Sequence, residues 1–347
     1  MTARWFRYQL NFKRPAGTSR GVMHYRNTWF IILEKDGKTG IGEAAMLSGL
    51  SADDHPGFEK NLDQLISLIN RNKPIDKSWL NNLPSLRYGL ETARISLETK
   101  TPWLPYPSEF TNGRRNIPIN GLIWMGEPAF MKSQIKEKIS QGFRCIKMKI
   151  GAIGFNEELS LLKMIRREFS GKELELRVDA NGAFSPDKAL EKLNRLAELN
   201  IHSIEQPIRA GQWEEMARLC ENSPVPVALD EELIGINTPA EKQRLIETIR
   251  PAWLILKPAL VGGFDAAEEW IGMAEKSGTG WWVTSALESN LGLNALAQWT
   301  AALDNPLPQG LGTGSLFTNN FRFPLFVRSG ELCYNPSETP QWPPFEL

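Results

Sequence analysis

Short apolar runs alternate with amphipathic stretches from about residue 117 to residue 315. The apolar runs have the length of buried strands and lie at residues 117–124, 145–150, 174–180, 202–207, 226–231, 253–259 and 281–289, with a short glycine-rich run at 310–314. Apolar positions recur at helical spacing in residues 127–141, 156–169, 185–199, 238–249, 264–277 and 292–303. Strands that alternate with helices of 10–15 residues predict a parallel sheet.

Two of these helices have clear start signals. Ser185 is expected as an N-cap, with Pro186 at the first helical position and Asp187 in the first turn. Thr238 and Pro239 repeat the same pattern before the helix at 238–249. The boundaries of both helices follow from these residues.

The number of elements favours a closed sheet. Eight strands joined by seven helices in about 200 residues predict an α/β fold of the (β/α)7β type, a TIM-like barrel without its last helix. A doubly wound open sheet is the alternative. That fold usually has a GxGxxG turn after its first strand, whereas WMGEPAF follows the first strand here.

The first part of the chain has a different pattern. RYQLNFK and TWFIILEKDGKTGIGEAA are strand-like, with Asp36-Gly37 as a turn, and a helical region ends near residues 86–99. We therefore expect a separate α+β domain at 1–112, a barrel domain at 113–318, and a C-terminal segment at 319–347 that packs back on the first domain.

Composition limits the possible partners. Among 347 residues, 40 Lys and Arg balance 40 Asp and Glu, so no nucleic-acid or anionic-membrane partner is indicated. No apolar run approaches the 18 residues of a membrane span, and the N-terminus lacks a signal-peptide pattern. Cys145, Cys220 and Cys333 are isolated, which favours reduced thiols in a cytoplasmic protein. No pattern indicates an oligomeric state.

Ionisable residues end five successive predicted strands. The active site of such a barrel lies at the carboxyl ends of its strands, so these residues are expected to surround one mouth. In chain order they are Lys149 (with Lys147 two residues earlier), Asp179, Glu205, Asp230 and Lys257. Taken singly, each is more simply a strand-end charge, a cap or a turn residue, and their coincidence is what indicates a site.

Three of these residues are candidate metal ligands. Asp179, Glu205 and Asp230 offer carboxylate oxygens from adjacent strands, a donor set that suits Mg²⁺, with Mn²⁺ possible, and argues against zinc. The chain has only three histidines, so a histidine-based metal site is not expected.

The lysines are candidate acid–base groups. Strands two and six of an eight-stranded barrel lie on opposite sides, so Lys149 and Lys257 should face each other across the mouth. Lys147 lies on the same strand face as Lys149. A neighbouring ammonium group and a dication both lower the pKa of a lysine, which would suit a general base.

Further candidates line the expected mouth. Possible substrate contacts are Lys147, Asn181, Ser285, Gly312 and Arg20. Residues 17–21 could form a lid over the site, although an ordinary hairpin loop explains them equally well. A tight turn explains Gly312 almost as well as contact with a ligand.

These motifs resemble those of the enolase superfamily, muconate-lactonising subgroup. KMK on strand two, RVDANGAF, SIEQP, ALDEEL and LKPALVGG match that subgroup at every functional position. TSALESNLGLNALAQW and GLGTGSLFTNNF resemble its o-succinylbenzoate synthase family in particular. The resemblance covers about residues 140–320, and the N-terminal region resembles the capping domain of the superfamily through weaker motifs.

The resemblance implies an activity and a set of roles. The reaction would be dehydration of 2-succinyl-6-hydroxy-2,4-cyclohexadiene-1-carboxylate to o-succinylbenzoate, through an enediolate, in menaquinone biosynthesis. Asp179, Glu205 and Asp230 would bind Mg²⁺, which holds the substrate carboxylate. Lys149 would remove the α-proton and then protonate the departing hydroxyl. Lys257 would place its ammonium group across the ring as a cation–π partner.

Other functions remain alternatives. An N-acylamino acid racemase would also use lysines on both faces. Dipeptide epimerases of the subgroup carry Asp-x-Asp near the last strand, whereas no aspartate follows Asp304 here. A non-catalytic metal-binding barrel would have no need for two opposed bases.

Overall fold

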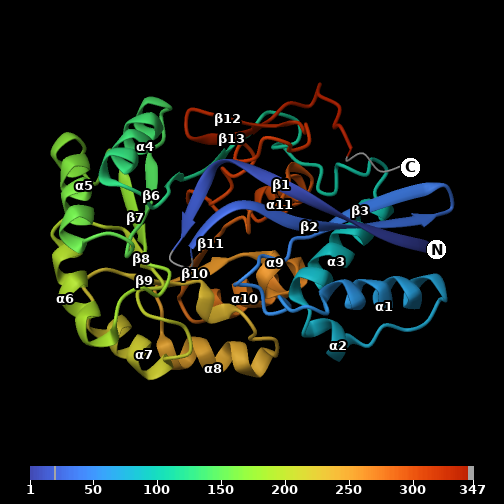
Figure 1. The fold of residues 1–347 in the computed structure, drawn as a ribbon, viewed down its shortest axis with the longest axis horizontal. Coiled ribbons are helices and arrows are strands. Elements are labelled where there is room, and N and C mark those ends of the chain that lie inside the picture. The colour runs from blue at the N-terminus through green and yellow to red at the C-terminus, as the bar shows by residue number, and fades with distance from the viewer. Residues whose placement is uncertain (19–20, 343–347) are drawn as a thin grey trace.

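The computed structural model describes residues 1–18 and 21–342. It contains an antiparallel sheet with three helices, which we call the capping domain, and a parallel sheet surrounded by helices, which we call the barrel (Figure 1). The predicted fold class is therefore confirmed. The exact boundaries at residues 112 and 318 stay predictions.

The capping domain is a hairpin-rich sheet backed by helices. Its strands β1 (Thr2–Thr18), β2 (Gly21–Lys35) and β3 (Lys38–Ala44) pair in that order, all antiparallel. Asp36 and Gly37 both have positive φ, 51° and 74°, as the tight turn between β2 and β3 requires. Apolar residues of this sheet, including Trp29, Ile31 and Leu33, pack against α1 (Phe58–Asn70) and α3 (Pro84–Glu98). A short helix, α2 (Lys77–Asn81), joins them.

The barrel strands form one parallel sheet of seven. Its order is β11-β10-β9-β8-β7-β6-β5, and the strands follow each other in chain order. Their bounds are β5 (Gly121–Ile123), β6 (Cys145–Lys149), β7 (Glu175–Asp179), β8 (Ser203–Glu205), β9 (Val227–Leu229), β10 (Trp253–Leu256) and β11 (Gly280–Val283). Most side chains of these strands are buried, because helices cover the outer face and side chains fill the interior.

The eighth predicted strand is absent as a strand. The glycine-rich run at 310–314 forms no ladder among the described residues. Instead, Gln309 makes a parallel bridge to Ile119, and Gly310 makes one to Thr284, so these two residues join β11 to the start of the barrel. A Cβ on Gly310 would lie 2.5 Å from the Thr284 hydroxyl, so the two chains approach too closely for a side chain at this position. The first predicted strand is likewise divided into β4 (Ile117–Pro118) and β5.

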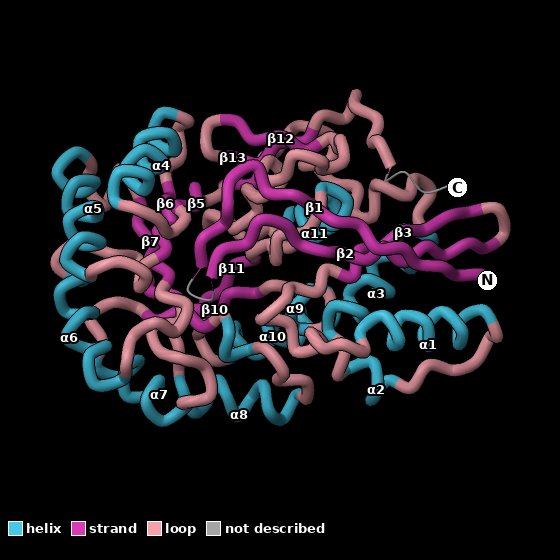
Figure 2. Tube along the Cα trace, in the orientation of Figure 1, coloured by secondary structure: helices cyan, strands magenta, loops and turns pink. Residues whose placement is uncertain are grey.

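Helices follow the barrel strands and wrap around them (Figure 2). They are α4 (Pro128–Ser140), α5 (Phe155–Glu168), α6 (Pro186–Ala197), α7 (Trp213–Asn222), α8 (Pro239–Ile249), α10 (Phe264–Lys276) and α11 (Asn290–Ala302), with a single turn at α9 (Pro258–Val261). Ser185 and Thr238 occupy the predicted N-cap positions. Thr238 forms a full capping box with Glu241, whereas the Ser185 side chain makes no capping hydrogen bond. None of the helices in the described part of the chain could cross a membrane.

The C-terminal segment contacts both parts of the molecule. Its strands β12 (Leu325–Arg328) and β13 (Glu331–Tyr334) form a three-stranded antiparallel sheet with β4 at the entry to the barrel. Towards the capping domain, the Tyr8 hydroxyl donates to the Asn319 carbonyl at 2.9 Å, and the centroids of the Tyr8 and Phe321 rings lie 4.9 Å apart. The segment thus bridges the barrel entry and the first strand.

Two carboxylates of the capping domain cap helices of the barrel. Glu43 of β3 accepts hydrogen bonds from the backbone N–H groups of Ser289 and Gly292, at the start of α11. Glu91 of α3 accepts from the N–H groups of Phe264 (2.6 Å) and Asp265 (3.0 Å), at the start of α10. The first N–H groups of a helix have no partner within the helix and carry partial positive charge. These contacts therefore dock the capping domain onto two helix termini.

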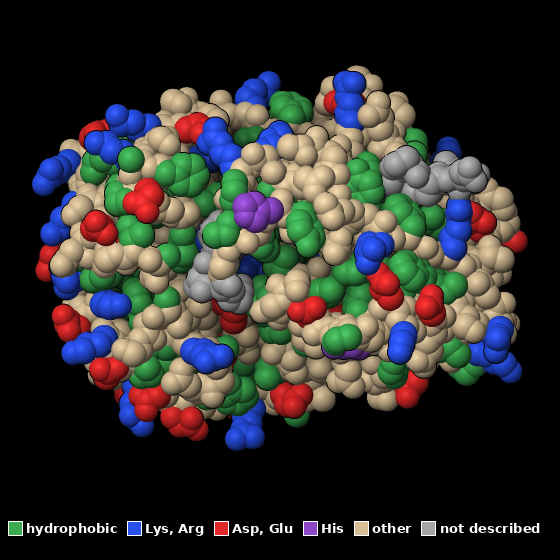
Figure 3. Space-filling view, viewed as in Figure 1, with side chains coloured by type: hydrophobic (Ala, Val, Ile, Leu, Met, Phe, Trp, Pro, Cys, Tyr) green, Lys and Arg blue, Asp and Glu red, His purple; other side chains and the backbone are tan. Residues whose placement is uncertain are grey.

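The molecular surface has no single-sign charge field on the face shown in Figure 3. Lys and Arg side chains are interspersed there with Asp and Glu. This pattern agrees with the neutral balance of the sequence.

Candidate active site

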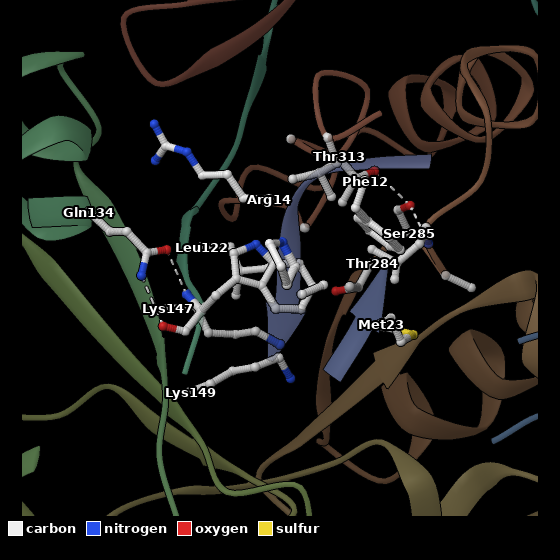
Figure 4. Close-up of a pocket in the computed structure, with 18 of the residues that line it drawn as sticks. Phe12, Arg14, Met23, Leu122, Gln134, Lys147, Lys149, Thr284, Ser285 and Thr313 are labelled. Carbon is white, nitrogen blue, oxygen red and sulfur yellow. Dashed lines mark hydrogen bonds between the residues drawn. The ribbon is translucent and has the colours of Figure 1, made fainter. Parts of the chain in front are cut away.

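A cavity of about 660 Å³ opens at the carboxyl ends of the barrel strands. The distal parts of β1 and β2 reach across this end of the barrel (Figure 1) and supply part of its wall, including Phe12 and Met23. The barrel supplies the rest, including Lys147, Lys149 and Lys257. Figure 4 shows Lys147 and Lys149 projecting side by side into the cavity from β6, with Ser285 and Thr313 on the opposite wall. Both parts of the molecule therefore shape a single binding space.

Three buried carboxylates lie directly behind the lysines that line this space. Asp179 ends β7, Glu205 ends β8, and Asp230 directly follows β9, and each is at most 2% exposed. Strand pairing places Lys149, Asp179 and Glu205 in one row. Glu205 pairs with Ala228, so Asp230 lies two residues further along its strand. Lys149, Asp179 and Glu205 thus lie at one level of the barrel, and the stagger of the barrel strands displaces Asp230.

The lysines pair directly with these carboxylates. Lys147 Nζ lies 2.6 Å from Glu205 Oε2 and 3.0 Å from Asp179 Oδ2. Lys149 Nζ lies 3.0 Å from the same Asp179 oxygen. Lys257, directly after β10, forms an ion pair with Asp230, and its Nζ is 3.9 Å from Glu205 Oε1. The structure thus brings all six charged candidates into one cluster.

Burial and the charges of neighbouring groups have opposing effects on the pKa values in the cluster. Burial alone would raise the pKa of Asp179, but the charges of the three lysines together lower it below its usual range. For Glu205, burial and the nearby Asp179 charge raise the pKa to about 8, despite Lys147.

The pKa values of Lys147 and Lys257 depart from the sequence-based expectation. For Lys147, burial favours the neutral form, but the charges of Asp179 and Glu205 outweigh it and raise the pKa. Likewise, Asp230 and Glu205 outweigh burial and raise the pKa of Lys257. Residue spacing indicates only the neighbouring ammonium groups and a dication, both of which lower a lysine pKa. Direct ion pairs with the carboxylates have the opposite effect, because they stabilise the ammonium form.

The carboxylates have the chemistry of a site for a divalent cation. Among the described residues, no three acidic side chains already stand together around a common point, because the lysine ammonium groups lie between them. Yet Glu205 Oε1 is buried and accepts no hydrogen bond within the described structure. A buried oxygen without a partner is costly, and a hard cation bound by the three carboxylates would satisfy it. The residues therefore fit such a cation.

Two residues with left-handed backbone conformations hold the strand ends. Asn181 (φ 43°) accepts from Lys149 Nζ at 2.6 Å and donates to Glu231 at 2.9 Å. Gln206 (φ 41°) is fully buried, and its side-chain oxygen accepts from the N–H groups of Asp230 and Glu232. Asn181, expected to contact the substrate, lines the cavity and also orients Lys149, and its contact with the substrate stays a prediction. Gln206 was not predicted, because a glutamine before a proline has no signal of its own.

The remaining substrate-binding candidates have different surroundings. Gly312 and Ser285 both line the cavity. The Ser285 hydroxyl donates to Glu288 at 2.5 Å and accepts from Thr313 Oγ1 at 2.8 Å and from Leu287 N at 3.0 Å. Its donor and both of its acceptor positions are thus in use within the protein. Arg20 and the middle of the predicted lid lie outside the described residues.

Comparisons with known protein families agree with both halves of this architecture. Residues 131–336 match the family model described as "Enolase C-terminal domain-like", and residues 1–97 match the one described as "MenC, N-terminal domain". Together the two matches cover the barrel and the capping domain.

Curated relatives and solved structures are similar over nearly the whole chain. An o-succinylbenzoate synthase of Desulfotalea psychrophila is 47% identical over 94% of this chain and 97% of its own length. The crystal structure of MenC from the same organism superposes with a TM-score of 0.86 at 42% identity, covering 96% of this chain and 99% of that one. An L-Ala-D/L-Glu epimerase of Bacillus subtilis is 23% identical over 78% of this chain and 75% of its own length.

Proposed function

Since the chain belongs to the o-succinylbenzoate synthase family of the enolase superfamily, we propose that it catalyses the dehydration of 2-succinyl-6-hydroxy-2,4-cyclohexadiene-1-carboxylate to o-succinylbenzoate, in menaquinone biosynthesis. It is an enzyme of the carbon–oxygen lyase type. A non-catalytic metal-binding barrel would have no need for the lysines of the site.

One arrangement carries this proposal. Lys149 on β6 and Lys257 after β10 stand four strands apart in the sheet, on either side of a buried row of carboxylates. A reaction that removes a proton beside a carboxylate needs a base close to the acidic carbon and positive charge where negative charge develops. The cluster offers both in a cavity that is large enough for a small aromatic acid.

Enzymes of this superfamily use a divalent metal, and we propose Mg²⁺, with Mn²⁺ as a substitute. Asp179, Glu205 and Asp230 would hold it, because carboxylate oxygens suit a hard cation. A cation bound there would supply positive charge beside the substrate carboxylate and would compete with the lysines for the same oxygens, which favours a neutral lysine.

Lys149 is the proposed proton carrier. It would take the proton from the carbon next to the ring carboxylate and return it to the departing hydroxyl, which leaves as water. Asn181 supports this role, because its 2.6 Å hydrogen bond fixes the direction of the Lys149 side chain. Lys257, held by Asp230, would keep its ammonium group over the opposite face of the ring.

The lining of the cavity suits an anionic substrate. Among the described residues its charged members comprise one acid, Glu137, and six cations, which are Lys13, Arg14, Lys138, Lys147, Lys149 and Lys257. Such an excess of positive charge attracts a dianion such as the proposed substrate. Lys147 and the backbone of Gly312 are the proposed contacts at the inner end.

The purified protein should convert the cyclohexadiene to o-succinylbenzoate, followed by loss of the diene absorbance and by NMR of the product. Treatment with EDTA should abolish turnover, and Mg²⁺ or Mn²⁺ should restore it. Full activity in a demonstrably metal-free sample would contradict the metal assignment. Failure to form product with metal present would contradict the activity itself. Assays of L-Ala-D/L-Glu epimerisation and of N-acylamino acid racemisation under the same conditions should show much slower reactions.

A further inference from the structure

A buried arginine lies between the two walls of the cavity. Arg26 is on β2 of the capping domain and is 4% exposed. It does not line the cavity itself. Its guanidinium lies behind two short segments that do: one follows β3 in the capping domain, and the other follows β11 in the barrel.

The hydrogen bonds of Arg26 join these two segments. Its Nη1 donates to the carbonyl oxygens of Ala286 (2.8 Å) and Leu287 (2.6 Å), in the barrel segment. Its Nη2 donates to the carbonyl of Met46 (3.2 Å), next to Leu47 in the capping segment. Leu47 and Leu287 both face the cavity. A single planar group thus holds one apolar wall residue from each domain.

Leu287 has an unfavourable backbone conformation, which its hydrogen bonds with Arg26 and Ser285 help to maintain. Its φ of 64° is left-handed, a conformation that residues with a Cβ disfavour. Its N–H donates to the Ser285 hydroxyl and its carbonyl accepts from Arg26. Both polar atoms are therefore held by side chains and not by regular secondary structure. Strained conformations of this kind persist where the surroundings enforce them, often at binding sites.

Burial of the charged Arg26 side chain costs free energy, which its surroundings must offset. Burial lowers its pKa, while the carboxylates Glu43 and Glu288 nearby oppose that shift. Within the described part of the chain, its side-chain hydrogen bonds go to backbone carbonyls and not to these carboxylates. A guanidinium offers donors in a rigid fork, which suits several fixed acceptors at once. A lysine in the same place would present one point charge without that geometry.

We propose that Arg26 is a positioning residue that determines substrate binding by fixing Leu47 and Leu287 as one continuous apolar wall. The wall contacts the part of the substrate that does not react. Among the described contacts, Arg26 has no hydrogen bond or ion pair with the lysines or carboxylates of the catalytic cluster, so it acts on affinity and selectivity and not on the proton transfer. This inference rests on the proposed function, because the substrate of that reaction is the molecule bound.

The test separates KM from kcat in matched variants. Arg26→Met should raise KM for the cyclohexadiene by about tenfold while kcat stays within about threefold, the pattern expected when binding unrelated to the chemical step is lost. Arg26→Lys should fall between Arg26→Met and the wild type, and it preserves the test if Arg26→Met does not fold. Leu287→Ala removes the wall side chain directly and should show the same split. Because Arg26 acts partly through Leu287, the double variant should raise KM by less than the product of the two single effects.

Glu91→Gln is the matched control for a change in the contact between the two domains. It replaces the carboxylate of another buried contact between them, at α10, away from the residues that line the cavity. Its KM should equal that of the wild type. An equal rise in KM for Glu91→Gln, unchanged kinetics in folded Arg26 variants, or a loss confined to kcat would each overturn the proposal.

Direct binding separates this proposal from the proposed function. Isothermal titration with o-succinylbenzoate and Mg²⁺ should show weaker binding to the Arg26 variants than to the wild type. If the wild type turns over the cyclohexadiene but the Arg26 variants bind and react like it, only the positioning role fails. If the wild type neither reacts nor binds, the proposed function fails, and the positioning role falls with it.

Discussion

Glu91 should make the stability of the protein depend on pH. Its carboxylate caps α10 from the capping domain, and burial raises its pKa from an ordinary 4.5 to about 7, even though the N–H groups of Phe264 and Asp265 and the nearby Arg87 favour the charged form. The folded state thus binds the proton more tightly than the unfolded chain does. The extra stability is fully present below about pH 4.5 and is lost as the pH rises through 7.

The magnitude follows from the shift. A difference of about 2.5 pKa units corresponds to about 3 kcal/mol, of which roughly 2.5 kcal/mol should be lost between pH 5 and pH 8. Glu91→Gln stays neutral at every pH and resembles the protonated carboxyl. From pH 5 to pH 8, the free energy of unfolding of the variant should therefore rise by roughly 2.5 kcal/mol relative to that of the wild type.

Urea unfolding of both proteins at pH 5, 6, 7 and 8 measures this change, because all other titrating groups cancel in the difference. Glu98→Gln, at an exposed position of the same helix, is the control and should show no such trend. A second measurement is the carboxyl ¹³C chemical shift of Glu91, which should titrate near pH 7. A constant stability gap from pH 5 to pH 8, or a titration near pH 4.5, would refute the reasoning.

Further outcomes are expected at four positions. Lys149→Arg should lose about 10²–10⁴-fold in turnover, because arginine stays protonated. If this variant still exchanged solvent deuterium into the substrate at the wild-type rate, the roles of the two lysines would be reversed. Glu205→Gln should weaken Mg²⁺ binding in isothermal titration with little change in circular dichroism, whereas unchanged affinity would remove it from the ligand set. Gly263→Ala should destabilise the protein by about 1–3 kcal/mol in urea, since φ is 105° and the new Cβ would lie 2.0 Å from Glu91 Oε2; equal stability would speak against that geometry. Ser285→Ala should cost about 1–3 kcal/mol of stability by leaving Glu288 without its hydroxyl donor and should keep kcat, while KM rises because the Leu287 N–H loses its acceptor; a rise in KM without a loss of stability would instead favour Ser285 as a direct substrate contact.

The barrel could be predicted because its strands are short continuous apolar runs. The run at 253–259, for example, becomes β10 and ends at Leu256, one residue before Lys257. The run at 310–314 misled the prediction, since glycine has no side chain to reveal which face is buried. There, close approach of Gly310 to Thr284 replaces a hydrogen-bonded ladder.

The charged cluster could be located from topology, but its surroundings could not. Parallel strands bring their carboxyl ends to one mouth, so residues far apart in the sequence are expected to meet. Direct pairing of Lys147 with Asp179 and Glu205 depends on side-chain distances that spacing does not contain. Arg26 and Glu43 gave no signal either, because a single charge within an apolar strand is ordinarily assigned to the solvent face.

The capping of barrel helices by Glu43 and Glu91 has a consequence for how the chain reaches its fold during synthesis. The capping domain leaves the ribosome first, but Glu43 contacts Ser289 at a sequence separation of 246 residues, and Glu91 contacts Phe264 at a separation of 173. Until those helices emerge, both carboxylates remain without their final partners. Contacts of such long sequence separation slow folding. The nascent capping domain should therefore stay loosely structured until α10 and α11 appear, which makes it the segment most dependent on chaperones.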